Sequence, residues 1–246
     1  MKTYLFKPYH SRQAFTLIEL IVVLTILVGL AGVLVPAVTN MVARTSRSTS
    51  ALNITEIAGT IQRHEAIYLK YPDNLDSLMR NTTGTDLNKL STSLTAGLVD
   101  VTIDVNTLAT LANAGITTVG VHALDDTTFN TPTLTALADQ FVVKGLLAAK
   151  QVALGLETTG TDGKYVVFGI GALSELNGRS MVDAPVHFPR DAASNPNSVY
   201  SRFIAVFQIT DGTDAITRAK FVGVLAPDGS AMSSELNGYF TSVLNN

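Results

Sequence analysis

The sequence predicts an α+β protein in which a long N-terminal helix, with a membrane half and an amphipathic half, packs on a C-terminal antiparallel sheet domain. Two observations predict this architecture. An apolar run near the N-terminus passes into a repeat of apolar residues at helical spacing, which continues to residue 71. The last third of the chain instead holds short runs of β-branched and aromatic residues between turn sequences rich in Asp and Gly.

Composition and charge exclude several classes of protein. The chain has 246 residues and a formal net charge of -3. The first fourteen residues carry Lys2, Lys7 and Arg12 and no acid, so the remainder has a charge of -6. This mildly acidic remainder gives no electrostatic footprint for nucleic acid, and no nucleic-acid partner is predicted. The absence of cysteine excludes disulfides, thiolate zinc sites and cysteine nucleophiles.

Glu19 is the single ionisable residue of the apolar run from Leu17 to Val38. A helix of this length crosses about 30 Å of hydrocarbon. A cleaved secretory signal would have a shorter apolar region, of about 7–15 residues. A plain membrane anchor fits the length, but it gives Glu19 no purpose and an insertion cost of about 2.5–3.5 kcal/mol. An interpretation of the apolar run that explains Glu19 must therefore include a partner for its carboxylate.

The sequence AFTLIEL, residues 14–20, closely resembles the leader motif of type IV prepilins and type II secretion pseudopilins. The resemblance makes residues 1–14 a basic leader peptide and residues 15–38 a transmembrane and polymerisation helix. It implies that a prepilin peptidase/methyltransferase cuts after Ala14, where the family more often has glycine, and N-methylates Phe15. Glu19 then becomes the fifth mature residue. Pro36 falls where many pilins have a helix-kinking proline.

A carboxylate in lipid needs a partner, and cleavage after Ala14 would create one in the ammonium group of Phe15. In a helix this amine and the carboxylate of Glu19 lie about one turn apart. The resemblance implies that Glu19 pairs with the amine of a neighbouring subunit during assembly. Buried ion pairs are weak evidence of stability, but they are suited to fixing register.

Residues 39–71 are expected to continue the helix as an amphipathic segment. Ile54, Ile57, Ile61 and Tyr68 recur at spacings of 3, 4 and 7 and define one apolar face. His64 is expected on the helix surface. The following YPDNLDSLM, residues 71–79, resembles the YP-x-x-L-x-x-L segment of major pseudopilins. An ordinary Pro-Asp turn that starts a short helix is the equally weighted alternative.

The globular domain is expected to span residues 72–246 and to lie in the periplasm or outside the cell. Its first part is rich in Thr, Asn and Gly and allows only coarse predictions. The segment Gln140–Leu156 fits a helix or a strand, because a short apolar run does not settle the period. The other expected elements are a helix at Asp86–Leu98, a strand at Val99–Val105, a helix at Thr107–Ala114 and a strand at Ile116–Leu124.

The C-terminal third gives the clearest strand signals. A strand is expected within Gly163–Gly171, after an Asp-Gly turn. The runs Val199–Thr210 and Ala215–Ala226, joined by DGTD, predict a hairpin. Pro227-Asp228-Gly229 predicts a further turn, after which the chain returns. The sequence SELNG occurs twice, at residues 174–178 and 234–238, and its Asn-Gly pair suggests a similar turn in both places.

A search for catalytic and metal-binding patterns gives no site. The sequence HEAIY at residues 64–68 lacks the second histidine of a zinc protease helix, and GIGALS at 169–174 lacks the third glycine of a dinucleotide-binding loop. Asp211, Asp214 and Asp228 lie in C-terminal turns, where the related pseudopilins often bind calcium. Aspartates in such turns are more often turn formers, so no metal site and no cofactor are predicted.

The leading hypothesis is therefore a pilin-like structural subunit and not an enzyme. It would assemble with other pilin or pseudopilin subunits into a type II secretion pseudopilus or type IV pilus-like filament, with protein secretion as the expected role. Before assembly it would cross the inner membrane once, with the basic leader in the cytoplasm and the body in the periplasm. The alternative is a membrane-anchored periplasmic binding domain that does not polymerise.

Overall fold

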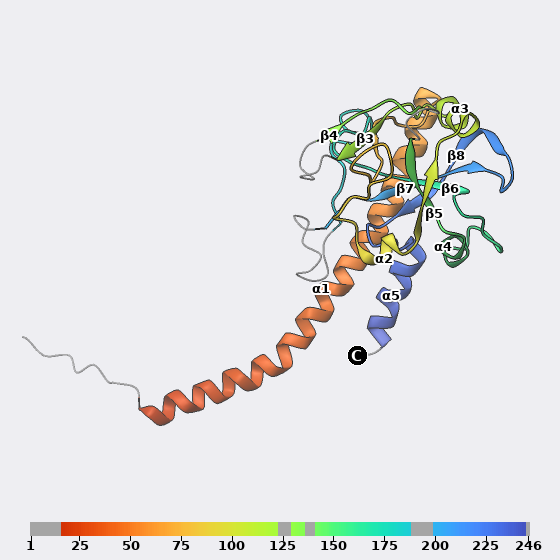
Figure 1. Cartoon of the computed structure of the whole chain (residues 1–246). Coiled ribbons are helices and arrows are strands. Elements are labelled where there is room, and N and C mark those ends of the chain that lie inside the picture. The colour runs from red at the N-terminus through yellow and green to blue at the C-terminus, as the bar shows by residue number, and fades with distance from the viewer. Residues whose placement is uncertain (1–15, 123–128, 136–140, 188–198, 245–246) are drawn as a thin grey trace, which may run out of the picture. The chain divides into compact units, whose positions relative to one another are not determined.

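A computed structural model of the chain describes residues 16–122, 129–135, 141–187 and 199–244. The packing of the chain divides it into two compact units, Met1–Val42 and Ala43–Asn246. A single helix, α1 (Leu17–Tyr68), supplies the described part of the first unit and the start of the second (Figure 1). The predicted cleavage site, Ala14 and Phe15, lies outside the described residues.

In the first unit, α1 is composed almost entirely of large apolar residues. Its length and composition are sufficient to cross a membrane, and no other helix among the described residues meets that test. Every side chain described from Thr16 to Val42 is exposed. Pro36 lies within α1, which continues beyond it. The kink expected at Pro36 stays a prediction.

In the second unit, α1 is amphipathic, as predicted. Ile54, Ile57 and Ile61 are buried, with exposed fractions of 5%, 1% and 0%. Two expectations for this face are wrong. Tyr68 is 43% exposed, because the helix ends there, whereas His64 is fully buried and takes the next position of the apolar face. The histidine is accommodated because its Nδ1 lies 3.1 Å from the backbone oxygen of Lys70.

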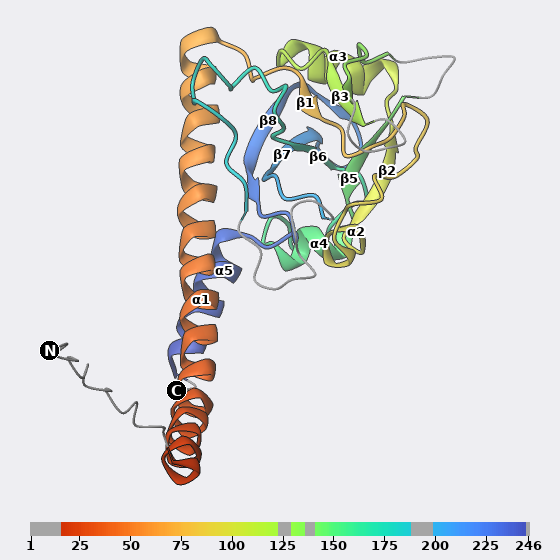
Figure 2. The ribbon, with the colours of Figure 1, turned by 90° about the vertical axis from the view of Figure 1, so that its left-hand side faces the viewer.

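Eight strands, all within the described ranges, form one curled sheet in the second unit (Figure 2). The path β2-β5-β6-β1-β3-β4 is joined by β7, which pairs with β6 and β8. The strands are β1 (Leu75–Asp76), β2 (Leu98–Thr102), β3 (Val119–His122), β4 (Phe129–Asn130), β5 (Val142–Leu146), β6 (Tyr165–Gly169), β7 (Ile204–Thr210) and β8 (Ala215–Leu225).

The antiparallel part of the sheet confirms the strongest strand predictions. Strands β7 and β8 form the expected hairpin, with Ile204 opposite Leu225 and Thr210 opposite Ala215. Strand β6 pairs antiparallel with β7 along its whole length, and β2 with β5. The sheet is mixed, however, because β1 runs parallel to β3, with Leu75 opposite Val119. The expected strands at residues 99–105 and 116–124 correspond to β2 and β3.

The described residues of the second unit also form four shorter helices: α2 (Thr92–Thr95), α3 (Val105–Asn113), α4 (Ala148–Ala153) and α5 (Met232–Leu244). The helix expected over residues 86–98 is wrong, since only α2 forms there. The ambiguous segment 140–156 contains both a strand and a helix, β5 and α4. After the turn at 227–229 the chain returns as the helix α5.

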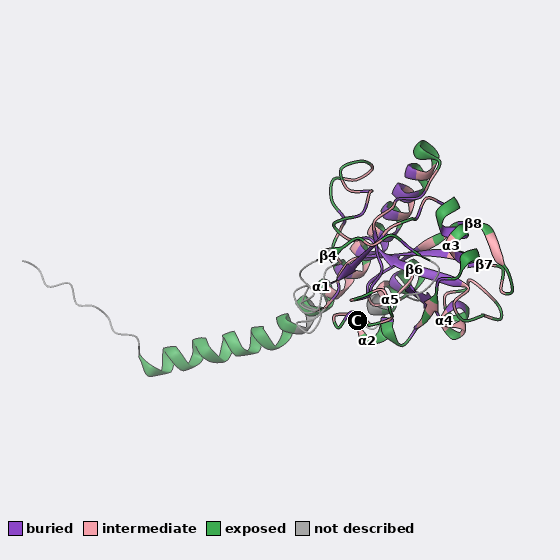
Figure 3. Cartoon of the chain, turned by 45° about the horizontal axis from the view of Figure 1, so that its top comes forward, coloured by how far each residue is buried: buried purple, intermediate pink, exposed green. Residues whose placement is uncertain are grey.

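The sheet is covered on both faces, because alternate residues of β6 and β7 enter two separate apolar clusters. Val166 and Phe168 pack with Phe207 in the cluster that includes Ile57 and Ile61 of α1. Tyr165 and Val167 pack in the second cluster with Leu94 of α2. Figure 3 shows these central strands in purple. The amphipathic part of α1 is thereby fixed to one face of the sheet.

Candidate functional site

The N-terminus of α1 is closed by a reciprocal hydrogen-bond arrangement between Thr16 and Glu19. The backbone N–H and the side-chain hydroxyl of Thr16 each donate to Oε2 of Glu19, both at 2.8 Å. The backbone N–H of Glu19 donates to Oγ1 of Thr16 at 3.3 Å. This is a capping box, which satisfies donors that a helix N-terminus otherwise leaves without partners. Glu19 therefore has a local structural partner as well as its predicted role in assembly.

The capping box was a signal that the sequence contained, since Thr16-x-x-Glu19 before an apolar run is its signature. It places the start of α1 directly after the predicted cleavage point. The structure thus explains why a helix begins at this place. It describes neither Ala14 nor Phe15, so their roles in cleavage and methylation remain predictions.

At its other end, α1 turns into the sheet through residues with left-handed backbone conformation. Leu69, Asn74 and Leu78 have φ angles of +57°, +55° and +61°. Such angles cost roughly 1–2 kcal/mol for a residue with a side chain, although asparagine tolerates them better. The short helix after Pro72, which was the alternative interpretation of this segment, does not form, and residues 75–76 form β1 instead.

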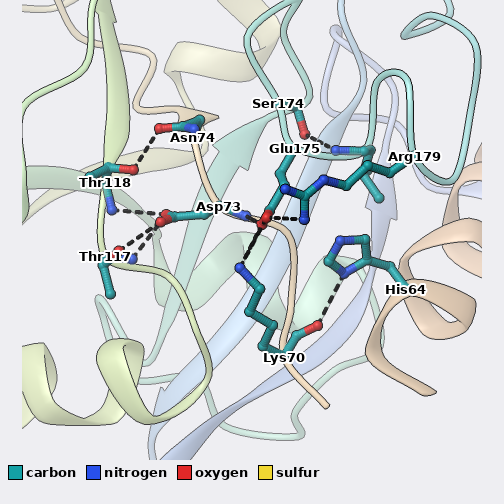
Figure 4. Close-up of polar contacts among 10 residues, drawn as sticks. His64, Lys70, Asp73, Asn74, Thr117, Thr118, Ser174, Glu175 and Arg179 are labelled. Atoms are coloured by element: carbon teal, nitrogen blue, oxygen red, sulfur yellow. Dashed lines mark hydrogen bonds and ion pairs between the residues drawn. The ribbon is translucent and has the colours of Figure 1, made fainter. Parts of the chain in front are cut away.

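Glu175 is the centre of a polar cluster that holds this turn in place (Figure 4). Its carboxylate accepts from Lys70 Nζ at 3.0 and 2.9 Å and from the backbone N–H of Asp73 at 3.1 Å. The guanidinium group of Arg179, one helical turn later in sequence, pairs with the same carboxylate. The backbone oxygen of Lys70 also faces His64. The cluster therefore joins the end of α1 to the loop that follows β6.

Asp73 extends the cluster toward β3. Its carboxylate accepts from the backbone N–H groups of Thr117 and Thr118, at 3.0 and 2.8 Å, and from the hydroxyl of Thr117 at 2.6 Å. Thr118 also donates to the side-chain oxygen of Asn74 at 2.6 Å. The end of α1 is thus connected to two distant parts of the chain by charged and neutral hydrogen bonds.

The charge state of Glu175 depends on this network. Burial raises the pKa of the Glu175 carboxyl, but the hydrogen bonds from Lys70 and from the Asp73 N–H outweigh burial, and the net pKa lies below 4.5. The ionised form is therefore favoured in the folded protein. These contacts fix structure, and none of them presents a reactive group to a substrate.

A second polar cluster lies on β1 and β3, where His122 and Tyr200 converge on Asp76. His122 Nε2 is 2.7 Å from Asp76 Oδ2, and the Tyr200 hydroxyl donates to the same oxygen at 3.0 Å. All three residues are buried. Burial, followed by the neighbouring Asp76 carboxylate, raises the pKa of Tyr200 well above its usual value. Sequence reasoning missed this cluster, since its members are 46 and 124 residues apart.

The C-terminal aspartates lie in turns, as the sequence suggested. Asp211 Oδ1 accepts from the backbone N–H groups of Thr213 and Asp214, at 3.0 and 2.9 Å. Asp228 Oδ1 accepts from the N–H of Ser230 at 2.8 Å. Within the described ranges, no group of three or more His, Cys, Asp or Glu side chains is arranged to hold a metal ion.

Comparison with known families gives one match. The family described as the prokaryotic N-terminal methylation motif matches residues 9–34. This range includes Glu19, the capping box and most of the apolar part of α1. Comparisons with curated proteins and with solved structures found no match.

The family match and the fold agree on the same interpretation. The helix α1 begins within the matched residues, is apolar in its first part and packs on the sheet in its second. Members that carry this motif are structural subunits, and the apolar helix is compatible with membrane anchoring. The chain carries the N-terminal methylation motif that is the hallmark of the type IV pilin and pseudopilin family.

Proposed function

We propose that this protein is a filament subunit that is processed and assembled in the manner of pseudopilins, in a system that serves protein secretion. The observation that carries the proposal is the methylation motif at residues 9–34, together with the exposed large apolar side chains of α1 from Leu17 to Val35. These side chains need a surrounding of lipid or of other helices. A subunit that moves from the membrane into a filament is surrounded first by lipid and then by the helices of other subunits.

Processing would take place between Ala14 and Phe15, and methylation on the new amino group of Phe15. The amine would then lie near Glu19, whose carboxylate already accepts from Thr16. Glu19 would pair with the amine of the next subunit. The apolar side chains alone allow many axial positions of one helix against its neighbour, and this ion pair would select one of them. Pro36 would bend α1 to suit this packing.

Intact-mass analysis of the protein purified from its own membranes tests the processing step. The expected chain lacks Met1–Ala14 and carries one additional methyl group. An unprocessed, unmethylated chain contradicts the proposal and favours the membrane-anchored binding domain that does not polymerise.

Two matched variants separate the assembly role of Glu19 from its capping role. Glu19→Gln keeps an acceptor for Thr16 but removes the charge, and we expect it to insert into the membrane and fail to enter filaments. Thr16→Ala removes the cap but keeps the charge, and we expect it to assemble. Filaments sheared from cells and quantified by immunoblot give the measurement. Normal assembly of Glu19→Gln would show that the charge does not set register.

A further inference from the structure

An exposed apolar tip lies at the end of α1, formed by Ile67, Tyr68 and Leu69. Their exposed fractions are 69%, 43% and 82%. Figure 3 shows this end of α1 in green, beyond the buried turns of the helix. His64 and Arg179 hold the Tyr68 ring, with centroid distances of 4.6 and 5.7 Å. The tip is therefore a fixed apolar surface of the second unit.

Leu69 is also in a strained conformation. With φ at +57° it occupies the position after the helix where glycine is usual, yet its side chain contributes little to the core. The fold uses the backbone of Leu69, whose N–H donates to the Glu65 oxygen at 2.8 Å and whose oxygen accepts from Arg218 Nη2 at 3.3 Å. It does not use the leucine side chain, which glycine would replace without strain. An apolar contact with another molecule would use this side chain.

The second unit also contains an apolar groove large enough to receive such a tip. Its volume is about 540 Å³, and an apolar cavity of about 150 Å³ already holds a benzene ring. The groove lies between α1, β8 and α5. The lining residues that matter here are Ile54, Ala58, Val222, Val224, Met232 and Leu236.

The apolar tip and the groove carry opposite charges beside them. Arg63 is exposed one helical turn before Ile67, and Glu56 is exposed next to Thr55 in the groove wall. Within the described part of the chain neither residue makes an ion pair. The apolar tip with Arg63 beside it therefore complements the groove with Glu56 beside it, both in apolar character and in charge.

We propose that the apolar tip of one subunit docks in the groove of a second copy of this chain. Because the tip and the groove are different surfaces, the contact is head-to-tail, and it adds subunits in an open series when the rotation between neighbours does not close a ring. An open series of this kind suits a filament. This inference rests on the proposed function and extends it to the contacts between the globular bodies.

A paired-cysteine experiment tests this contact, and the chain has no native cysteine to interfere. The full-length Leu69→Cys, Leu236→Cys double variant is expressed in the native host with its assembly system and oxidised in intact cells. We expect a ladder of covalent dimers, trimers and larger species. A disulfide within one chain is excluded by distance. Leu236 lies one helical turn after Met232, which contacts Thr55 of α1. Thr55 is about 21 Å along the helix from Leu69, too far for a disulfide to bridge.

Three controls make the result decisive. Each single cysteine variant should give no ladder, and dimers from Leu69→Cys alone would overturn the head-to-tail arrangement. The Leu69→Cys, Val105→Cys pair places the second thiol on another exposed apolar residue and should also give none. Filaments that form normally while the Leu69/Leu236 pair stays uncrosslinked would overturn the docking proposal and leave the filament function standing. Absence of filaments and of methylation would overturn both.

Leu69→Gly provides a second measurement that a purely structural role does not predict. Glycine removes the strain, so the Tm of the purified full chain in detergent should rise by about 2–4 °C. Filament yield should nevertheless fall several-fold, as it should for Leu236→Glu in the groove. A fall in Tm with Leu69→Gly, or unchanged filament yield in both variants, would overturn the role of the apolar tip.

Discussion

The two parts of α1 have the same backbone conformation but different surroundings. From Thr16 to Val42 every described side chain is exposed, whereas from Ala43 to Tyr68 one face is buried against the sheet. Average apolar character does not account for the contrast, because the exposed part is the more apolar one. The comparison shows that the second part is held by the fold of its own chain, while the described chain leaves the first part exposed.

The largest difference in unfolding free energy is expected between two side-chain truncations, one in the buried part of α1 and one in the exposed part. Ile61 is fully buried, and Ile61→Ala should lower the free energy of unfolding by about 2–5 kcal/mol. Leu24→Ala should change it by less than about 0.5 kcal/mol, because Leu24 contacts no core. Urea unfolding of the full chain in detergent, followed by tyrosine fluorescence, measures both. Equal losses would show that the two parts unfold together.

The next effect concerns the cluster that fixes the end of α1. Glu175→Gln leaves Lys70 and Arg179 without their shared carboxylate, and we expect a loss of about 1–3 kcal/mol in unfolding free energy. The matched control, Glu56→Gln, changes an exposed glutamate on the same unit and should have little effect. If the two variants unfold alike, the cluster does not anchor the helix.

Acid should weaken the same anchor. Because the pKa of Glu175 is lowered in the folded state, its contribution is present above pH 4.5 and is lost as the pH falls through the folded value. The unfolding free energy of the wild type should therefore decline more steeply below pH 4.5 than that of Glu175→Gln. Urea titrations at a series of pH values measure the two slopes. Parallel curves would assign the acid sensitivity to other carboxylates.

The sequence was sufficient to predict elements whose signal is local. The apolar run predicted the first part of α1, and DGTD between two β-rich runs predicted the β7–β8 hairpin. The same local reasoning failed for SELNG. At residues 174–178 it forms a turn, with Gly178 at φ +75°, but at 234–238 it lies within α5. Tertiary packing decides between these outcomes, and five residues do not encode it.

The polar clusters were outside the reach of sequence reasoning for a related reason. His64 was expected on the surface because histidine is usually solvated, but it is buried where a single backbone oxygen lies 3.1 Å from its Nδ1. Glu175 and Lys70 are 105 residues apart. Neither position has a spacing pattern that identifies its partner, so only the folded chain shows which polar residues meet.

The smallest effect is expected at the capping boxes of α1 and α3, which can be compared directly. Asp104 caps α3 in the second unit: its Oδ1 accepts from the Thr107 N–H at 2.7 Å, and the Thr107 hydroxyl accepts from the Asp104 N–H at 3.0 Å. Asp104→Ala should therefore lower the unfolding free energy by about 1 kcal/mol.

Thr16→Ala removes the equivalent interaction from α1, but its helix end belongs to the part without a core. We expect no measurable change in unfolding of the second unit, with only local fraying of α1 visible as faster amide hydrogen exchange near residues 17–20. Hydrogen exchange read by mass spectrometry, with urea unfolding in parallel, distinguishes the two cases. A global loss on Thr16→Ala would mean that order in the apolar part of α1 is coupled to the fold of the body, and that the two parts of the helix are less independent than their burial indicates.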